Sequence, residues 1–96
     1  MSSPDIYEFA FDDINIEEFA RHGIRWEQVD QVLDNQYVTQ RNRRQRRATY
    51  LVIGKDNGGR YISVPIEPTH LATLWRPVTA YPSKYSEITD YRKVVR

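Results

Sequence analysis

Residues 49–64, TYLVIGKDNGGRYISV, decide the fold of this chain. Residues 49–53 and 60–64 are rich in β-branched and aromatic side chains, a composition typical of strands. Between them lies Asp56-Asn57-Gly58-Gly59, in which the Asn57-Gly58 pair tolerates the positive φ angles that a tight hairpin turn needs. The stretch therefore predicts an antiparallel β-hairpin.

The segments on either side of the hairpin predict two helices before it and one after it. Asp12 or Asp13 can cap the first helix, and Gly23 can end it by adopting a left-handed conformation. Its apolar stripe consists of Ile14, Ile16, Phe19 and Ala20. The second helix has a periodic apolar face that consists of Trp26, Val29, Val32 and Leu33. Ser83 can cap the last helix, in which we expect one shared face of Tyr85, Ile88 and Tyr91.

Three further strands are expected, at residues 6–11, 37–39 and 71–79. Pro77 interrupts the last of them and indicates a sheet edge or a bulge, because proline donates no hydrogen bond to a neighbouring strand. The chain is thus expected to be one α+β domain over residues 1–96, with two N-terminal helices, an antiparallel meander and a C-terminal helix.

Composition excludes several classes of protein. The chain has 96 residues, of which 40% are hydrophobic, and it lacks cysteine. Disulfides, thiolate metal sites and a cysteine nucleophile are therefore excluded, and no metal or cofactor is expected. There is no recognisable signal peptide and no apolar run long enough to cross a membrane, so we expect a soluble, cytoplasmic protein.

Charge is divided between the two halves of the chain. Residues 1–40 carry nine acidic side chains and two arginines, whereas residues 41–96 carry twelve basic and four acidic side chains. Five arginines fall within seven residues at the boundary, an arrangement that favours a polyanionic partner such as RNA. We expect this arginine-rich segment to guide RNA to the protein or to dock an acidic partner; it consists of Arg41, Arg43, Arg44, Arg46 and Arg47.

Several motifs, in this order, resemble those of the BrnT family of bacterial type II toxins, which have the RelE-like ribonuclease fold. The resemblance covers most of the chain, although Tyr81 stands where the family has a second arginine. The resembling residues are Phe11-Asp12, His22-Gly23-Ile24 with Trp26 and Glu27, Gly54 with Gly59-Arg60, Arg76 with Thr79-Ala80-Tyr81, and Glu87 with Tyr91.

The resemblance implies a metal-independent endoribonuclease toxin whose partners are RNA and a cognate antitoxin. Such an antitoxin is a DNA-binding protein, here expected to be of the ribbon-helix-helix type. A homodimer or a toxin–antitoxin heterotetramer is the assembly to expect.

Cleavage of RNA without a metal needs cations for the phosphate charge and groups that move protons. Arg60, Arg76 and Lys55 are the candidate cations, and we expect Arg60 and Arg76 to converge because they fall on or near neighbouring strands. His70 is the candidate for proton transfer, since an unperturbed histidine has a pKa of about 6.5. Tyr81 can donate a hydrogen bond or stack on a base.

Two other functions remain open. The chain can be a RelE-fold module that binds nucleic acid or protein without cleaving it, as the replacement of the second arginine and the lack of a convincing base suggest. A sequence-specific DNA-binding protein is less favoured, because the early helices are acidic and no basic helix has helix-turn-helix spacing.

Overall fold

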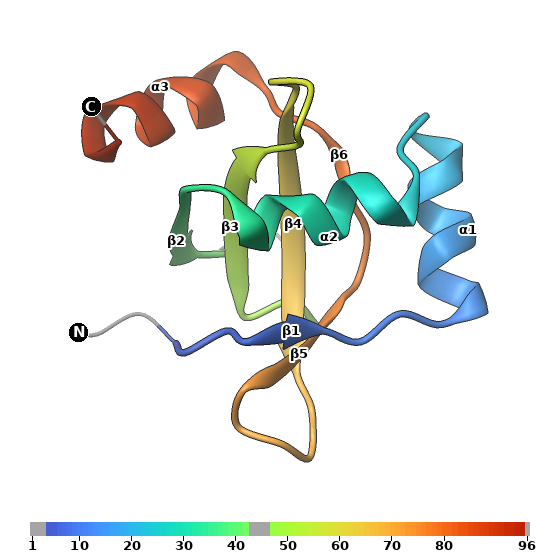
Figure 1. The fold of residues 1–96 in the computed structure, drawn as a ribbon. Helices are drawn as coiled ribbons and strands as arrows, with labels where there is room; N and C mark the ends of the chain where they lie inside the picture. Colours follow the sequence, from blue (N-terminus) through green and yellow to red (C-terminus); the bar gives the residue numbers. More distant parts are fainter. Residues whose placement is uncertain (1–3, 43–46, 96) are drawn as a thin grey trace.

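The computed structural model describes residues 4–42 and 47–95, and in this part of the chain three helices pack on a six-stranded sheet (Figure 1). The elements follow the order β1 (Glu8–Phe9), α1 (Asp13–Arg21), α2 (Trp26–Asp34), β2 (Tyr37–Arg41), β3 (Tyr50–Lys55), β4 (Tyr61–Pro68), β5 (Leu74–Pro77), β6 (Tyr81–Pro82) and α3 (Tyr85–Val94). The α+β class, the two N-terminal helices and the C-terminal helix are confirmed.

The predicted hairpin is formed by β3 and β4, which pair antiparallel from Tyr50↔Ile66 to Lys55↔Tyr61. Its turn differs from the expected one, because Gly59 rather than Asn57 or Gly58 has a positive φ, of 84°. The Gly59 N–H donates to the Asp56 carbonyl. A tight turn followed by a left-handed glycine is a common way to close a hairpin with a slightly longer loop.

The sheet is mixed and has the order β1-β5-β4-β3-β2, with β6 also paired to β4. Strands β2 to β5 form the predicted antiparallel meander, but β1 pairs parallel to β5 through Glu8↔Leu74 and Phe9↔Trp75. The first strand is also shorter than expected, because β1 consists of Glu8–Phe9 alone rather than residues 6–11. Pro77 does not mark an edge strand: β5 lies between β1 and β4, and Pro77 ends it beyond the last residue that pairs with β1.

Helix α1 begins with reciprocal hydrogen bonds between Asp12 and Asn15. The Asn15 N–H donates to Asp12 Oδ1 over 2.8 Å, and the Asp12 N–H donates to Asn15 Oδ1 over 2.9 Å. Asn15 is fully buried, and its Nδ2 donates to the carbonyls of Ala10 and Pro77. The expected apolar stripe is partly wrong, because Ile14 is 72% exposed while Asn15 takes the inward position.

Helices α1 and α2 contribute to a core on one face of the sheet. Val29 and Val32 of α2 are fully buried against the strand residues Val52, Ile62, Val64 and Ile66. Helix α2 approaches the sheet closely at Gly54, where a Cβ atom would lie 2.8 Å from Val32 Cγ1. Trp26, expected on the buried face, is 40% exposed, because it is the first residue of the helix.

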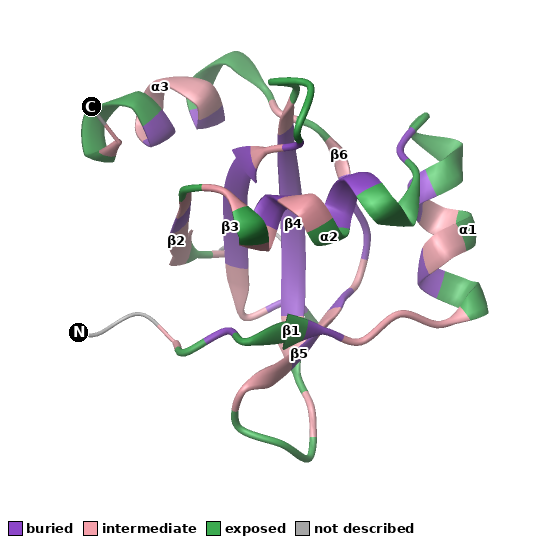
Figure 2. Cartoon of the chain, in the orientation of Figure 1, coloured by how far each residue is buried: buried purple, intermediate pink, exposed green. Residues whose placement is uncertain are grey.

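Helix α3 packs on the opposite face of the sheet, where Tyr91 joins Val38, Leu51 and Ile53 in a smaller apolar cluster. Buried residues run along β3 and β4 between the two helical layers (Figure 2). The predicted face of α3 is partly wrong: Tyr91 is buried as expected, but Tyr85 is 85% exposed and Glu87 is the other buried residue. No helix in the described ranges is long and apolar enough to cross a membrane.

Replacing Asn15 with alanine should lower the free energy of unfolding by about 3 kcal/mol, because it removes the side-chain acceptor of the Asp12 N–H and leaves two carbonyl groups without their donor. Urea denaturation measures this change. Ile14→Ala is the matched control in the same helical turn and should change stability by less than about 0.5 kcal/mol. Equal losses for the two variants would contradict the role of Asn15.

Candidate functional site

The face of the sheet on which α3 packs, called here the α3 face, carries many of the predicted residues. Side chains directly opposite each other on neighbouring strands lie on the same face. The pairs Ile53↔Ser63 and Lys55↔Tyr61 belong to this face, because Ile53 packs with Tyr91 and Ser63 contacts Glu87 of α3. Farther along β4 the same alternation places Glu67, and with it Arg76, on the α3 face.

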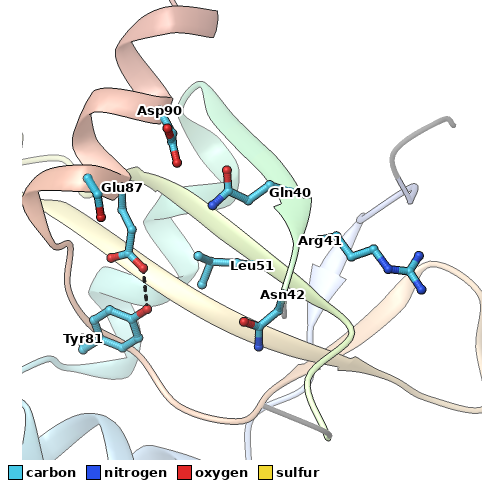
Figure 3. Close-up of a pocket in the computed structure, with 8 residues that line it drawn as sticks. Gln40, Arg41, Asn42, Leu51, Tyr81, Glu87 and Asp90 are labelled. Carbon is cyan, nitrogen blue, oxygen red and sulfur yellow. Dashed lines mark hydrogen bonds between the residues drawn. The ribbon is translucent and has the colours of Figure 1, made fainter. Parts of the chain in front are cut away.

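A pocket of about 400 Å³ opens on the α3 face beside α3 (Figure 3). Its walls come from β2, the chain just after β2, β3, β6 and α3. Two sequence candidates, Arg41 and Tyr81, lie at this pocket. The lining residues are Gln40, Arg41, Asn42, Leu51, Tyr81, Ser86, Glu87 and Asp90.

Glu87 is a buried carboxylate held in place by hydrogen bonds. Its Oε1 accepts from Ser63 Oγ over 2.9 Å and from the Lys84 N–H over 2.8 Å, and its Oε2 accepts from Tyr81 Oη over 2.7 Å. Ser63 Oγ is in turn 2.7 Å from Ser83 Oγ. This network joins β4, β6 and α3, and it fixes the direction of the Tyr81 hydroxyl at the pocket wall.

Asp90 is a pocket residue that sequence reasoning missed. It lies three residues after Glu87 on α3, is half-buried, and has no hydrogen-bond or ion-pair partner among the described residues. The sequence signal that could have indicated it was the i, i+3 spacing of Asp90 from Glu87, which places both acids on one side of a helix. An acidic side chain in a helix is ordinarily solvated, however, so this spacing alone did not indicate a site. In the pocket a carboxylate can accept a proton from a hydroxyl group, whereas Arg41 lies at the rim with its side chain directed away from the two acids (Figure 3).

Arg76 is held by two carboxylates on its own side of the sheet. Its Nε donates to Asp12 Oδ2 over 2.7 Å, its Nη2 donates to Asp12 Oδ1 over 3.2 Å, and its Nη1 donates to Glu67 Oε2 over 2.8 Å. The Arg76 hydrogen bond is the largest cause of a lowered pKa of Asp12, while Asp12 and Glu67 raise the pKa of Arg76. Arg76 therefore joins the start of α1 to β4 and β5, in addition to any role toward RNA.

Arg60 lies far from Arg76. It directly precedes β4, whereas Arg76 is paired with Glu67 near the other end of that strand, about 23 Å away at the rise of a strand. The expectation that the two arginines converge is therefore wrong. The exposed Arg60 side chain donates to the carbonyl of Gly23 over 3.4 Å. The backbone N–H of Arg60 donates to the Asp56 carboxylate.

The Asp56 carboxylate organises the hairpin turn near Arg60. Burial raises the pKa of Asp56, but hydrogen bonds from Gln28 and from the N–H groups of Arg60 and Gly58 outweigh that effect, and the pKa is lowered. Arg60 thus lies beside a stabilised turn rather than at the pocket.

The remaining candidates are dispersed. His70 lies in the exposed loop between β4 and β5 and makes no hydrogen bond to another described residue. Lys55 ends β3 with its Nζ 5.0 Å from the centre of the Tyr61 ring. Arg47 donates to Glu67 over 3.1 Å, so it shares this carboxylate with Arg76. The other arginines of the segment, Arg43, Arg44 and Arg46, lie outside the described residues.

Groups of three or more side chains suited to holding a metal ion do not occur in the described ranges. In comparisons with known proteins, no family model matches the chain, and no curated protein matches it either. The structure thus brings Arg41 and Tyr81 to one pocket with Glu87 and Asp90, and it separates Arg60, Arg76, Lys55 and His70.

Replacing Arg76 with methionine should destabilise the fold at pH 7 by about 1–2 kcal/mol, since the charged hydrogen bonds lie in a partly exposed site. Arg76 depresses the folded-state pKa of Asp12, so this stabilisation is present above the ordinary value of 3.8 and is lost as the pH falls through the folded-state pKa. Urea denaturation at pH 7 and pH 3 should show a smaller loss at pH 3.

The matched control is Arg47→Met, which removes an exposed cation from the same Glu67. It should change stability by less than about 0.5 kcal/mol at either pH. An Arg76→Met loss that is the same at pH 7 and pH 3 would contradict the assigned ion pair.

Proposed function

We propose that this protein is an endoribonuclease toxin of the BrnT-like, RelE-fold class, that RNA binds along its α3 face, and that an antitoxin neutralises it. The order of helices and strands agrees with the fold that the resemblance implies. The N-terminal helices cover one face of the sheet, while α3 leaves a pocket open on the other face.

The observation that carries the proposal is the convergence of two kinds of group at this pocket. Asp90 supplies a carboxylate without a partner among the described residues, and Tyr81 a hydroxyl fixed by Glu87, while Arg41 lies at the rim with its side chain directed away from them (Figure 3). A volume of about 400 Å³ is within the usual range of ligand pockets. The arginine-rich segment begins at the rim, with Arg41 and Asn42, and brings further positive charge to the same connection between β2 and β3.

In the proposed reaction, the 2′-oxygen of a ribose attacks the adjacent phosphorus while its proton passes to Asp90. The bond from phosphorus to the 5′-oxygen breaks, and that oxygen takes up a proton from solvent water. The products are a 2′,3′-cyclic phosphate and a 5′-hydroxyl end. The arginine-rich segment that begins at the rim supplies positive charge for the phosphate oxygens, and Tyr81 Oη, whose own proton is donated to Glu87, accepts a hydrogen bond from the departing 5′-hydroxyl.

A non-catalytic RNA-binding module is the second candidate, and the position of Arg76 favours it. The guanidinium that the resemblance assigns to catalysis already donates to Asp12 and Glu67. An enzyme that used Arg76 would have to compete with two carboxylates for its charge. The second candidate predicts RNA binding on the α3 face without cleavage.

Incubation of RNA with the purified protein in EDTA tests the proposal. We expect cleavage to 2′,3′-cyclic phosphate ends, and a rate about 100-fold lower for Asp90→Asn, because the proton acceptor is lost. Tyr81→Phe should also slow the reaction while Glu87 stays bound to Ser63 and Lys84.

Asp34→Asn is the matched control, an exposed acid at the end of α2, and it should cleave at the wild-type rate. If wild type and both pocket variants leave RNA intact, the non-catalytic module is favoured. Induced expression in a bacterial host adds a second readout, since the toxin arrests growth and translation and the module does not.

A further inference from the structure

A cluster of cations and tyrosines lies on the α3 face, outside the pocket, where β3, β4 and α3 meet. Lys55 Nζ is 5.0 Å from the centre of the Tyr61 ring and 5.9 Å from that of Tyr91. Arg92 Cζ is 5.7 Å from the Tyr61 ring centre, and Arg92 Nε donates to Tyr61 Oη over 3.4 Å. Two positive side chains therefore share one phenol.

The two cations of this cluster have no acidic partner. Among the described residues, Arg21, Arg47 and Arg76 form ion pairs, but Lys55 and Arg92 do not. The hydrogen bond from Arg92 and the nearby charge of Lys55 lower the pKa of Tyr61, because both favour the phenolate. The distances of Lys55 and Arg92 from the Tyr61 ring thus concentrate positive charge around Tyr61.

Tyr85 lies on the same flank of α3 as Arg92. Residues seven apart on a helix differ by about 20° in direction, since seven residues make nearly two turns. Tyr85 is 85% exposed and makes no ring contact with another described residue. A large aromatic side chain left so open, two helical turns from an unpaired cation on the same flank, is suited to stacking on a base.

We propose that Lys55, Arg92 and Tyr85 form a subsite for single-stranded RNA, in which the two cations bind one backbone phosphate and the Tyr85 ring stacks on a neighbouring base. The inference rests on the proposed function for its ligand. It is separate from the pocket, because Ser86 and Asp90 lie on the opposite flank of the buried Glu87–Tyr91 stripe.

An acidic protein segment is the other anion that this surface can attract. The exposed ring favours RNA, since an acidic peptide gains little from an aromatic face, whereas each nucleotide presents a phosphate and a planar base together. The subsite extends the path of RNA across α3 from the pocket, and it contributes affinity rather than chemistry.

Fluorescence anisotropy with a labelled 2′-O-methyl oligouridylate measures this binding without cleavage, because the attacking hydroxyl is blocked. Tyr85→Ala should weaken binding about 10-fold. The double variant Lys55→Gln/Arg92→Gln should also bind more weakly. The slope of log affinity against log salt concentration should become shallower by about 0.7, because one fewer phosphate is neutralised.

The matched controls are Tyr7→Ala, another strongly exposed tyrosine, and Lys93→Gln/Arg25→Gln, which removes two exposed charges outside the cluster. Both should retain affinity within about twofold, and urea denaturation should show that all variants are folded. Test variants that bind the oligonucleotide like wild type would overturn the subsite, even if RNA is cleaved.

Failure of the proposed function gives a different result. A protein that does not cleave RNA but loses oligonucleotide affinity on substitution of Tyr85 retains the subsite. If a labelled polyglutamate peptide binds the wild type and binds the test variants more weakly, while the oligonucleotide does not bind, the surface belongs to a protein partner and the subsite is overturned.

Discussion

Strand β4 imposes the constraint on which the rest of the structure depends, because it pairs with β3, β5 and β6 and is packed on both faces. Its even-numbered residues Ile62, Val64 and Ile66 fill the core beneath α1 and α2. Its odd-numbered residues face α3, where Ser63 holds Glu87 and Glu67 holds Arg76. A shift of one residue in its pairing would place these polar groups in the core and abolish both networks.

The fold pairs an acidic side chain of the N-terminal half with a basic side chain of the C-terminal half. Asp12 from the acidic half binds Arg76 from the basic half, and this pair joins α1 to the sheet. Other basic side chains remain without acidic partners in the described ranges, notably Lys55 and Arg92 on the α3 face. Lys55 and Arg92 thus place part of the unpaired positive charge on the side of the sheet that α1 and α2 do not cover, which is the side proposed to contact RNA.

Local signals made the hairpin and the helices predictable from sequence. Helix α1, for example, begins after Asp12, whose side chain caps it, and ends before Gly23, which adopts a positive φ. The parallel pairing of β1 with β5 was not predictable, because two residues carry no periodic pattern and their partner lies 66 positions away. The predicted buried face of α3 was wrong at Tyr85 for another reason. Apolar periodicity selected Tyr85, whereas hydrogen bonds from Ser63, Tyr81 and Lys84 bring the acidic Glu87 inward.

Tyr81 also explains why a pocket-side cation must come from elsewhere in the chain. An arginine at this position, as in the resembling family, would offer its charge to Glu87, whereas the Tyr81 hydroxyl donates a neutral hydrogen bond and leaves the carboxylate charged. Among the residues that line the pocket, Glu87 and Asp90 are acidic, and the Arg41 side chain points away from them (Figure 3). A phosphate can enter such a pocket only if more positive charge accompanies it, and the arginine-rich segment that begins at Arg41 is placed in the sequence to provide that charge.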